Sequence, residues 1–336
     1  MNILVTQRLP DIVMNLLQSA HTVSVGSDDR PMTSQSLIRE MAHVDGLLST
    51  ISDRIDPVVM DAAPGLKIIA NYGVGYNHID LAAATRRGIL VTNTPDVLTD
   101  ATADLTFALI LALARRIVEG DRRTRSGEFR YWAPLTFLGT EVSGKTLGII
   151  GMGRIGRAVA KRAAGFNMNI VSMSRKNKNP SDTDTSVQYT DFDTLLKIAD
   201  FVSLHVPLTP ETHHLVGKNE LEKMKPTAFL INTSRGPVVD ESALTDILFR
   251  NRIAGAGLDV YEHEPVLAQG LSDCSNCILL PHVGSATIET RTRMGMMAAH
   301  NLLDGLDGKR PANCLNYQAV YEKKCRGREG DIDRKQ

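Results

Sequence analysis

The segment Thr146-Leu-Gly-Ile-Ile-Gly-Met-Gly-Arg-Ile-Gly-Arg-Ala-Val-Ala160 decides the fold of this chain. It starts as an apolar run typical of a buried strand and ends with the apolar spacing of a helix. Between them, Gly151, Gly153 and Gly156 have the spacing Gly-x-Gly-x-x-Gly. The spacing alone occurs often by chance, but a strand before it and a helix after it indicate a dinucleotide-binding turn.

Each glycine of this turn has its own physical purpose. The first allows the tight turn, the second lets the backbone approach a pyrophosphate, and the third lets the helix pack close to the strand. The helix N-terminus then offers amides and a positive dipole end to the phosphates. The alternative is a turn that is packed for structural reasons alone. We predict that the cofactor is bound here by Gly151, Gly153, Arg154, Ile155 and Gly156.

The end of the next strand predicts which cofactor is used. About 20 residues past the loop, an NAD-selective site places an acidic residue that accepts both ribose hydroxyls. Here the strand Ile170-Val-Ser-Met173 is followed by Ser174-Arg-Lys176. A carboxylate would repel a 2′-phosphate, whereas a hydroxyl and two cations bind it. The sequence therefore predicts NADP (NADPH), with NAD as a weaker alternative, unless Arg175 and Lys176 are ordinary solvated charges.

Length and composition limit the class of protein. A chain of 336 residues predicts about two domains. Lys+Arg and Asp+Glu balance at 38 each, so no overall field attracts nucleic acid or a membrane surface. The longest apolar run, Leu105 to Ala114, is too short for the ~20 residues of a membrane span, and the N-terminus has no signal pattern. We expect a cytoplasmic protein.

The cysteines give no sign of a metal site. Cys274-Ser-Asn-Cys277 has the spacing of a redox or zinc pair, but no second pair follows at ligand spacing. We therefore expect an ordinary loop there and predict no bound metal.

Apolar segments alternate with helical patterns along the whole chain, which favours parallel sheets covered by helices on both faces. The first part contains five expected strands, at residues 3–5, 23–25, 46–48, 67–70 and 89–91. The second part contains six, at residues 146–150, 169–173, 201–204, 228–231, 255–259 and 278–280. Long helices are expected at residues 101–117 and 288–303. The prediction is an α/β protein with two Rossmann-like, doubly wound domains.

Three residues in the second half of the chain suit the chemistry of a 2-oxo acid. They are Arg235, Glu264 and His282. An arginine can grip a planar carboxylate through two parallel hydrogen bonds, and a histidine held by a carboxylate can donate a proton to the neighbouring carbonyl oxygen. Both Glu262 and Glu264 follow Asp259, and the family resemblance described below selects Glu264 through its Glu-Pro pair.

The other histidines differ in their sequence contexts. His205 closes the strand at 201–204 just before Pro207, so it is expected at the carboxyl edge of the sheet, near the cofactor. His213, His214 and His300 fall in polar helical patterns and are expected at the surface.

The segment Asn71-Tyr-Gly-Val-Gly75 ends a strand with two glycines. Its amides can point away from the sheet and bind a carboxylate. The alternative is a tight turn that needs the backbone freedom of glycine, and the two explanations are compatible.

Several of these motifs together resemble the D-isomer-specific 2-hydroxyacid dehydrogenases, and most of all their glyoxylate/hydroxypyruvate reductase branch. The similarity runs from about Ile3 to about Leu315. It rests on the glycine turn and the helix at 101–117, and on the segments Asn71-Tyr-Gly-Val-Gly-Tyr-Asn-His-Ile-Asp80, Asn232-Thr-Ser-Arg-Gly236, Gly257-Leu-Asp259 and Pro281-His-Val-Gly-Ser-Ala-Thr287.

The resemblance implies a discontinuous first domain. Residues 1–98 and 286–316 would bind substrate, residues 99–285 would bind the dinucleotide, and the active site would lie in a cleft between the two domains. The polar tail at 317–336 is expected to be disordered. A homodimer is also implied, formed through the helix at 101–117 and the following segment, with Trp132 reaching toward the partner.

The resemblance also assigns roles to residues. Arg235, Glu264 and His282 would be catalytic, and Arg235 and His282 would hold the 2-oxo acid together with the amides of Val74 and Gly75. The expected function is NADPH-dependent reduction of a 2-oxo acid of the glyoxylate/hydroxypyruvate type to the D-2-hydroxy acid. Further cofactor contacts are expected at Thr233 and Asp259, which would hold the nicotinamide end, and at His205, Pro207, Thr212, His282 and Gly284.

Other functions of the same fold stay open at this point. A 2-ketogluconate reductase or a phosphite dehydrogenase is compatible, because the sequence does not arrange pocket residues such as Leu48, Ser49, Tyr76 and Trp132. A nucleotide-sensing transcriptional corepressor is the alternative outside enzymes. The lack of a long polar extension and of a net basic domain argues against it.

Overall fold

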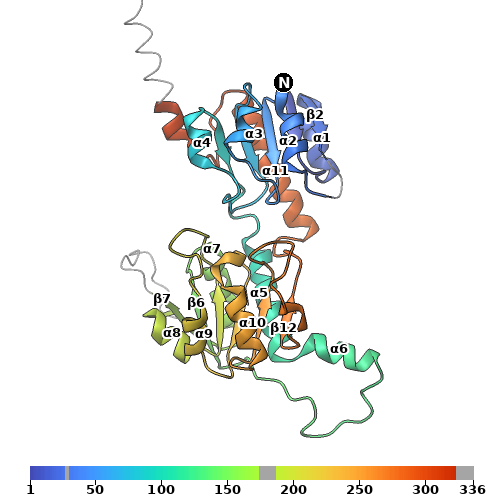
Figure 1. Ribbon diagram of the computed structural model, residues 1–336, viewed down its shortest axis with the longest axis vertical. Coiled ribbons are helices and arrows are strands. Elements are labelled where there is room, and N and C mark those ends of the chain that lie inside the picture. The colour runs from blue at the N-terminus through green and yellow to red at the C-terminus, as the bar shows by residue number, and fades with distance from the viewer. Residues whose placement is uncertain (27–29, 174–186, 323–336) are drawn as a thin grey trace, which may run out of the picture. The chain divides into compact units, whose positions relative to one another are not determined.

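The computed structural model describes residues 1–26, 30–173 and 187–322. The chain forms two compact units, Met1–Leu98 with Thr287–Gln336 (unit 1) and Thr99–Ala286 (unit 2) (Figure 1). Helices in the described ranges are all too short or too polar to cross a membrane.

Unit 1 is built on a five-stranded parallel sheet with the order β2-β1-β3-β4-β5. The chain begins in the middle of the sheet, and Ile3 of β1 pairs with Val23 on one side and Gly46 on the other. The strand order therefore reverses between β1 and β3, which is the point where open α/β sheets bind ligands. The strands are β1 (Asn2–Val5), β2 (Thr22–Val25), β3 (Gly46–Ser49), β4 (Ile68–Asn71) and β5 (Leu90–Thr92).

Helices cover both faces of this sheet. One buried cluster joins the sheet to α1 (Asp11–Ala20) and α11 (Ile288–Leu306). The other joins it to α2 (Ser34–Glu40), the short 3₁₀ helix η1 (Met41–His43), α3 (Pro57–Asp61) and α4 (Leu81–Arg86). Gly305 lets α11 lie close to the sheet, because a Cβ there would be 2.4 Å from Ile68 Cδ1.

Unit 2 is built on a seven-stranded parallel sheet with the order β12-β11-β10-β9-β6-β7-β8. The strand before the glycine turn, β6, lies between β9 and β7, so the order reverses at that turn. The strands are β6 (Thr146–Ile150), β7 (Asn169–Met173), β8 (Val187–Thr190), β9 (Phe201–Leu204), β10 (Phe229–Asn232), β11 (Gly255–Leu258) and β12 (Cys277–Leu279).

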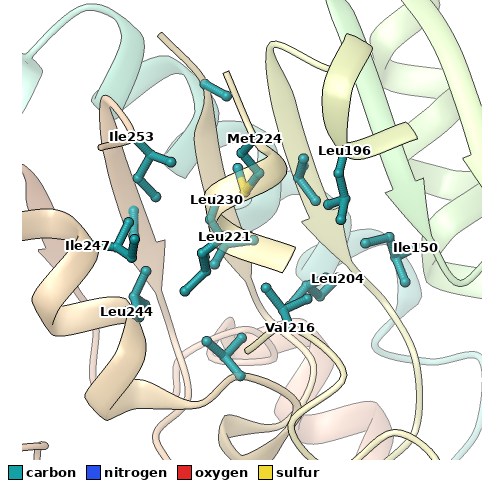
Figure 2. Close-up of a cluster of buried hydrophobic side chains, with 14 of the residues drawn as sticks. Ile150, Leu196, Leu204, Val216, Leu221, Met224, Leu230, Leu244, Ile247 and Ile253 are labelled. Atoms are coloured by element: carbon teal, nitrogen blue, oxygen red, sulfur yellow. The ribbon is translucent and has the colours of Figure 1, made fainter. Parts of the chain in front are cut away.

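This sheet also has a core on each face. One cluster contains residues of α5 (Thr99–Ala114) and α7 (Arg154–Ala164), together with the stacked rings of Phe201 and Phe229. The other contains residues of α8 (Phe192–Ile198), α9 (Lys218–Lys223) and α10 (Glu241–Phe249), and Figure 2 shows its aliphatic side chains meeting between helices and strands. Along a strand such as β10, successive residues point to opposite faces, so Phe229 and Ile231 lie in one cluster and Leu230 lies in the other.

The predicted fold class is confirmed, but three details of the prediction were wrong. The second sheet has seven strands and not six, because β8 adds to its edge with no fully buried residue and hence no apolar run. The helix expected at 101–117 ends at Ala114, and α6 (Ile117–Arg125) starts after Arg116, which has a positive φ of 53°. Residues 317–322 of the expected disordered tail are helical, because Val320 is buried in the core of unit 1.

Candidate functional site

The glycine turn of unit 2 links β6 to α7 at the point where the strand order reverses. Gly151 has a φ of 103°, and a Cβ there would be 2.6 Å from the backbone of His205. A Cβ on Gly156 would be 2.1 Å from the carbonyl oxygen of Gly151. Packing within the protein therefore accounts for the first and third glycines of the motif.

The second glycine is different. A Cβ on Gly153 would meet no atom within 4 Å among the described residues. Gly153 is the N-cap of the 11-residue α7 and is exposed. The turn therefore leaves open space over the end of α7, where amides and the helix dipole favour an anion. A dinucleotide pyrophosphate fits this arrangement.

The residues predicted to select the cofactor lie outside the described part of the chain. β7 ends at Met173, and Ser174, Arg175 and Lys176 follow in the undescribed range 174–186. In the sequence they directly follow β7, the first strand after the glycine turn. The structure does not describe their contacts.

His205 is held at the carboxyl end of β9. Its amide donates to the carbonyl of Ile150 at 2.8 Å, and its Nε2 lies 2.8 Å from the hydroxyl of Ser203. Its Nδ1 is buried without a partner among the described residues. Burial lowers the pKa of His205 to about 3, so the imidazole is neutral at physiological pH. An unpaired, buried nitrogen on a sheet edge is suited to a ligand atom.

Pro207 and Thr212 belong to one turn. The Thr212 hydroxyl donates to the carbonyl of Pro207 at 2.7 Å and accepts the amide of Thr209 at 2.8 Å. These two hydrogen bonds show that the buried Thr212 hydroxyl stabilises the turn. Its contact with the cofactor stays a prediction.

The loop after β10 is shaped by Asn232. Its side-chain oxygen accepts the amide of Ser234 at 3.0 Å, and its nitrogen donates to the carbonyl of Arg235 at 3.0 Å. Thr233, also in this loop, is buried with its hydroxyl 3.0 Å from that of Thr106 on α5. Asn232 therefore folds the turn that presents Arg235. The sequence placed this asparagine in a motif, but its bracing role was not foreseen.

Arg235 is half-buried, and its Nη1 donates to the carbonyl of Ser234 at 2.6 Å. Burial lowers the pKa of Arg235, and the negative charge of Glu264 opposes this change. The guanidinium stays charged, because arginine does not lose its proton in proteins. Glu264 thus lies close enough to Arg235 to act on it electrostatically.

Glu264 and His282 form the predicted pair. His282 Nδ1 lies 2.8 Å from Glu264 Oε2, and Glu264 Oε1 accepts the amide of Tyr261 at 3.0 Å. Burial would raise the pKa of Glu264, but the hydrogen bond and charge of His282, the Tyr261 amide and Arg235 outweigh burial and lower it. The carboxylate is therefore ionised, and His282 Nε2 is the nitrogen left to face a substrate.

Asp259 fixes the backbone that carries His282. Its Oδ1 accepts the amide of Val283 and its Oδ2 that of Gly284, both at 2.7 Å. The side chain is 1% exposed, and burial raises its pKa against the opposing effect of those amides and of His282. His282 itself has a left-handed φ of 54°. Such a conformation costs about 1 to 3 kcal/mol in a residue with a side chain, so it must be imposed by its surroundings.

The glycine segment Asn71-Tyr-Gly-Val-Gly75 of unit 1 presents backbone groups and not charged side chains. Asn71 Nδ2 donates to the carbonyls of Gly73 and Gly75 at 2.9 and 3.0 Å, and Asn93 Nδ2 donates to that of Val74 at 2.9 Å. The amides of Val74 and Gly75 have no acceptor among the residues that the structure describes. Two side-chain amides therefore hold the carbonyls and leave backbone N–H groups for another partner. Asn93 was missed by the sequence argument, because a single asparagine after a strand carries no motif.

Comparison with known proteins shows the family of this chain. Residues 107–284 match the sequence model of the D-isomer specific 2-hydroxyacid dehydrogenase family, NAD binding domain. The chain is 49% identical to a glyoxylate reductase of Thermococcus litoralis over 318 residues, covering 94% of this chain and 96% of that protein.

Solved structures give the same result. A Thermus thermophilus protein is 46% identical, with a TM-score of 0.88 over 94% of this chain and 100% of that one. An NADPH-dependent glyoxylate/hydroxypyruvate reductase of Sinorhizobium meliloti, solved with NADP and malonate, is 33% identical, with a TM-score of 0.82 over 94% of this chain and 96% of that one. This chain therefore belongs to the D-isomer-specific 2-hydroxyacid dehydrogenase family.

Proposed function

We propose that the protein uses NADPH to reduce a small 2-oxo acid, of the glyoxylate/hydroxypyruvate type, to the 2-hydroxy acid, which has the D configuration where its carbon is stereogenic. The observation that carries this proposal is the Glu264–His282 pair at 2.8 Å, with the charge of Arg235 beside it. An anion anchor next to a carboxylate-held imidazole is what reduction of a 2-oxo acid needs. The names of the relatives support the same substrate class.

Each residue of this group has one role in the reaction. The Arg235 guanidinium binds the carboxylate of the 2-oxo acid and so places its keto group. His282 Nε2 then gives a proton to the keto oxygen while a hydride arrives at the keto carbon, so the C=O bond becomes CH–OH. Glu264 stabilises the protonated imidazole and fixes its orientation through Nδ1.

A bound nicotinamide cofactor supplies the hydride. The open space over Gly153 and the end of α7 would hold its pyrophosphate, with Arg154 and Ile155 in the first turn of that helix. Thr233, Asp259 and Gly284 lie on the loops after β10, β11 and β12 and would hold the nicotinamide end. The proposed preference for NADPH rests on Ser174, Arg175 and Lys176, where an NAD-selective site has a carboxylate.

We also propose a substrate role for the amides of Val74 and Gly75. Their support is the geometry of the loop, in which all three neighbouring carbonyls are occupied by asparagine side chains and these two amides are left over. Backbone amides bind a carboxylate without adding a charge.

The test is kcat/KM for glyoxylate, hydroxypyruvate and longer 2-oxo acids, each with NADPH and NADH at one salt concentration. We expect glyoxylate or hydroxypyruvate with NADPH to give the highest value. Arg175→Ala should raise KM for NADPH by roughly ten- to over a hundredfold, because a charge-assisted hydrogen bond to phosphate is lost. Its effect on NADH should be small. A wild type that prefers NADH, or a variant that weakens both cofactors equally, contradicts the cofactor proposal.

A homodimer is proposed from the surface of unit 2. α6 has no buried residue, and the segment after it exposes Tyr131, Trp132 and Leu135, with Trp132 79% exposed. Figure 1 shows α6 leading away from the sheet of unit 2 and the chain after it returning in a long loop. Large apolar side chains grouped on one arm mark an interaction surface. Solution scattering at micromolar concentration should give the mass of a dimer, and a monomer mass contradicts this proposal.

A further inference from the structure

Two histidines and a glutamate that the proposed reaction does not use lie together in unit 2. His213 and His214 were expected in a helical setting, but they lie in a turn between β9 and α9. Glu262 lies on the loop after β11. One ligand-type atom of each side chain lies within 4.8 Å of the others.

The backbone of the turn brings the two imidazoles together. The amide of His213 donates to the carbonyl of Thr209 at 3.0 Å, and that of His214 donates to the carbonyl of Pro237 at 2.8 Å. His214 has a left-handed φ of 50°, which a residue with a side chain adopts at a cost of about 1 to 3 kcal/mol. As a result, the two rings face each other with centroids 4.1 Å apart.

Glu262 is held in place from the other side. Its Oε1 lies 2.7 Å from His214 Nε2, and its Oε2 accepts the amide of Glu241 at 3.4 Å. The amide of Glu262 donates in turn to the side chain of Glu241, which is only 3% exposed. These contacts hold the Glu262 carboxylate beside the ring of His214.

We propose that His213, His214 and Glu262 form a binding site for a divalent transition metal ion of the zinc type. Imidazole nitrogens with one carboxylate suit zinc, nickel or copper, whereas magnesium and calcium prefer oxygen ligands alone. Zinc–nitrogen bonds are about 2.0 to 2.1 Å long, so two ligand atoms on a tetrahedral ion lie about 3.3 Å apart. On metal binding, the distance between His214 Nε2 and Glu262 Oε1 must therefore increase slightly from 2.7 Å. The distances from these atoms to the ligand atom of His213, now at most 4.8 Å, must decrease.

The side chains allow this adjustment. His213 is exposed, and its ring nitrogens have no partner among the described residues, so the ring can turn toward the ion. His214 and Glu262 are half-buried and already in contact, so they form the ordered half of the site. Water would complete the coordination. The proposed site shares no ligand with the Glu264–His282 pair, because Glu262 contacts His214 and Glu264 contacts His282.

The experiment is a calorimetric titration of the full chain, without a histidine tag, with ZnCl₂ in a buffer that does not chelate metals. We expect one ion per chain. His213→Ala should weaken binding at least roughly tenfold, because one ligand is lost while the His214–Glu262 contact is kept. His300→Ala is the matched control, because His300 is an exposed histidine on α11, and it should bind zinc like the wild type. No binding, or equal binding by His213→Ala, would overturn the proposal.

Cobalt distinguishes this site from a cysteine site. Cys274 and Cys277 are free thiols and also lie in unit 2. Co²⁺ bound at the histidine cluster should give visible d–d bands without a thiolate charge-transfer band in the near ultraviolet, and Glu262→Gln should weaken them. A thiolate band would assign the metal to the cysteines and contradict the proposal. Because both measurements follow metal binding and not turnover, their outcome is independent of the proposed reaction.

Discussion

The carboxyl edges of the two parallel sheets carry different kinds of polar group. In unit 2, ionised side chains gather on the loops after β10, β11 and β12, and Glu264 lies between His282 and the charge of Arg235. The corresponding edge of unit 1 presents backbone amides and buried hydroxyls. It contains the Asn71-braced glycine loop, one buried carboxylate and several hydroxyls, namely Thr6, Ser49, Thr50, Asp53, Thr92 and Thr94.

One architecture presents two different sets of polar groups in this chain. Both sheets present strand ends where the strand order reverses, so the backbone offers a site in each unit. Unit 2 adds charges and a left-handed histidine, which suits proton transfer. Unit 1 adds unpaired amides and hydroxyls, which suits recognition of an anion without proton transfer. The buried hydroxyls of Ser49, Thr92 and Thr94 have no partner among the described residues, and this suggests ligand contacts.

The largest expected effect belongs to the proton donor in unit 2. His282→Ala should lower kcat by roughly 10² to 10⁴, the usual contribution of a general acid. NADPH affinity, measured by fluorescence titration, should stay close to that of the wild type. Near-normal turnover in this variant would show that His282 is not the proton donor, and the proposed difference between the two units would then be wrong.

The anion anchor should give a smaller effect. Arg235→Lys keeps the charge but loses the fork that matches a carboxylate. We expect kcat/KM for the 2-oxo acid to fall at least tenfold, or about 1.4 kcal/mol of transition-state stabilisation. Steady-state kinetics with glyoxylate provides the measurement. If lysine serves equally well, Arg235 acts as a point charge and the two-bond grip is wrong.

In unit 1, two neighbouring hydroxyls should differ in their effect on stability. The Thr50 hydroxyl donates to buried Asp53 at 3.0 Å, whereas that of Ser49 has no partner among the described residues. Thr50→Val should therefore lower the stability of unit 1 by about 1 kcal/mol, and Ser49→Ala should change it by less than about 0.5 kcal/mol. Urea midpoints followed by a probe in unit 1 would show the difference. Equal losses would mean that the free hydroxyl of Ser49 has a structural role.

Much of the fold was predictable because its signals are local. Buried parallel strands give continuous apolar runs, and all eleven expected strands were placed within one residue of their observed ends. β8 was not predicted, because an edge strand with no buried residue gives no apolar run. The break between α5 and α6 at Arg116 was not predicted, because no sequence pattern indicates a positive φ at an arginine.

The site was predictable only in part. The sequence predicted that Glu264 holds His282, and the structure brings these two side chains into contact, while their catalytic role stays a prediction. The supports of these residues depend on the folded backbone, as when Asp259 binds the amides of Val283 and Gly284. The contact between His214 and Glu262 joins residues 48 apart in the chain, and no local pattern predicts it. Ser174, Arg175 and Lys176 lie outside the described residues, so their role stays a prediction.

The central claim is that His282 donates the proton while ionised Glu264 holds it. The depressed pKa of Glu264 means that this carboxylate, and the stability that it adds to the pair, is present above its unfolded value of about 4.5 and lost only at lower pH. At higher pH the carboxylate therefore stays negatively charged at 2.8 Å from His282 Nδ1. The most direct measurement is kcat/KM for glyoxylate against pH, in the wild type and in Glu264→Gln. We predict that the fall in activity with rising pH begins at lower pH in Glu264→Gln, because a neutral amide no longer stabilises a positive charge on the neighbouring ring. Superimposable profiles would contradict the account.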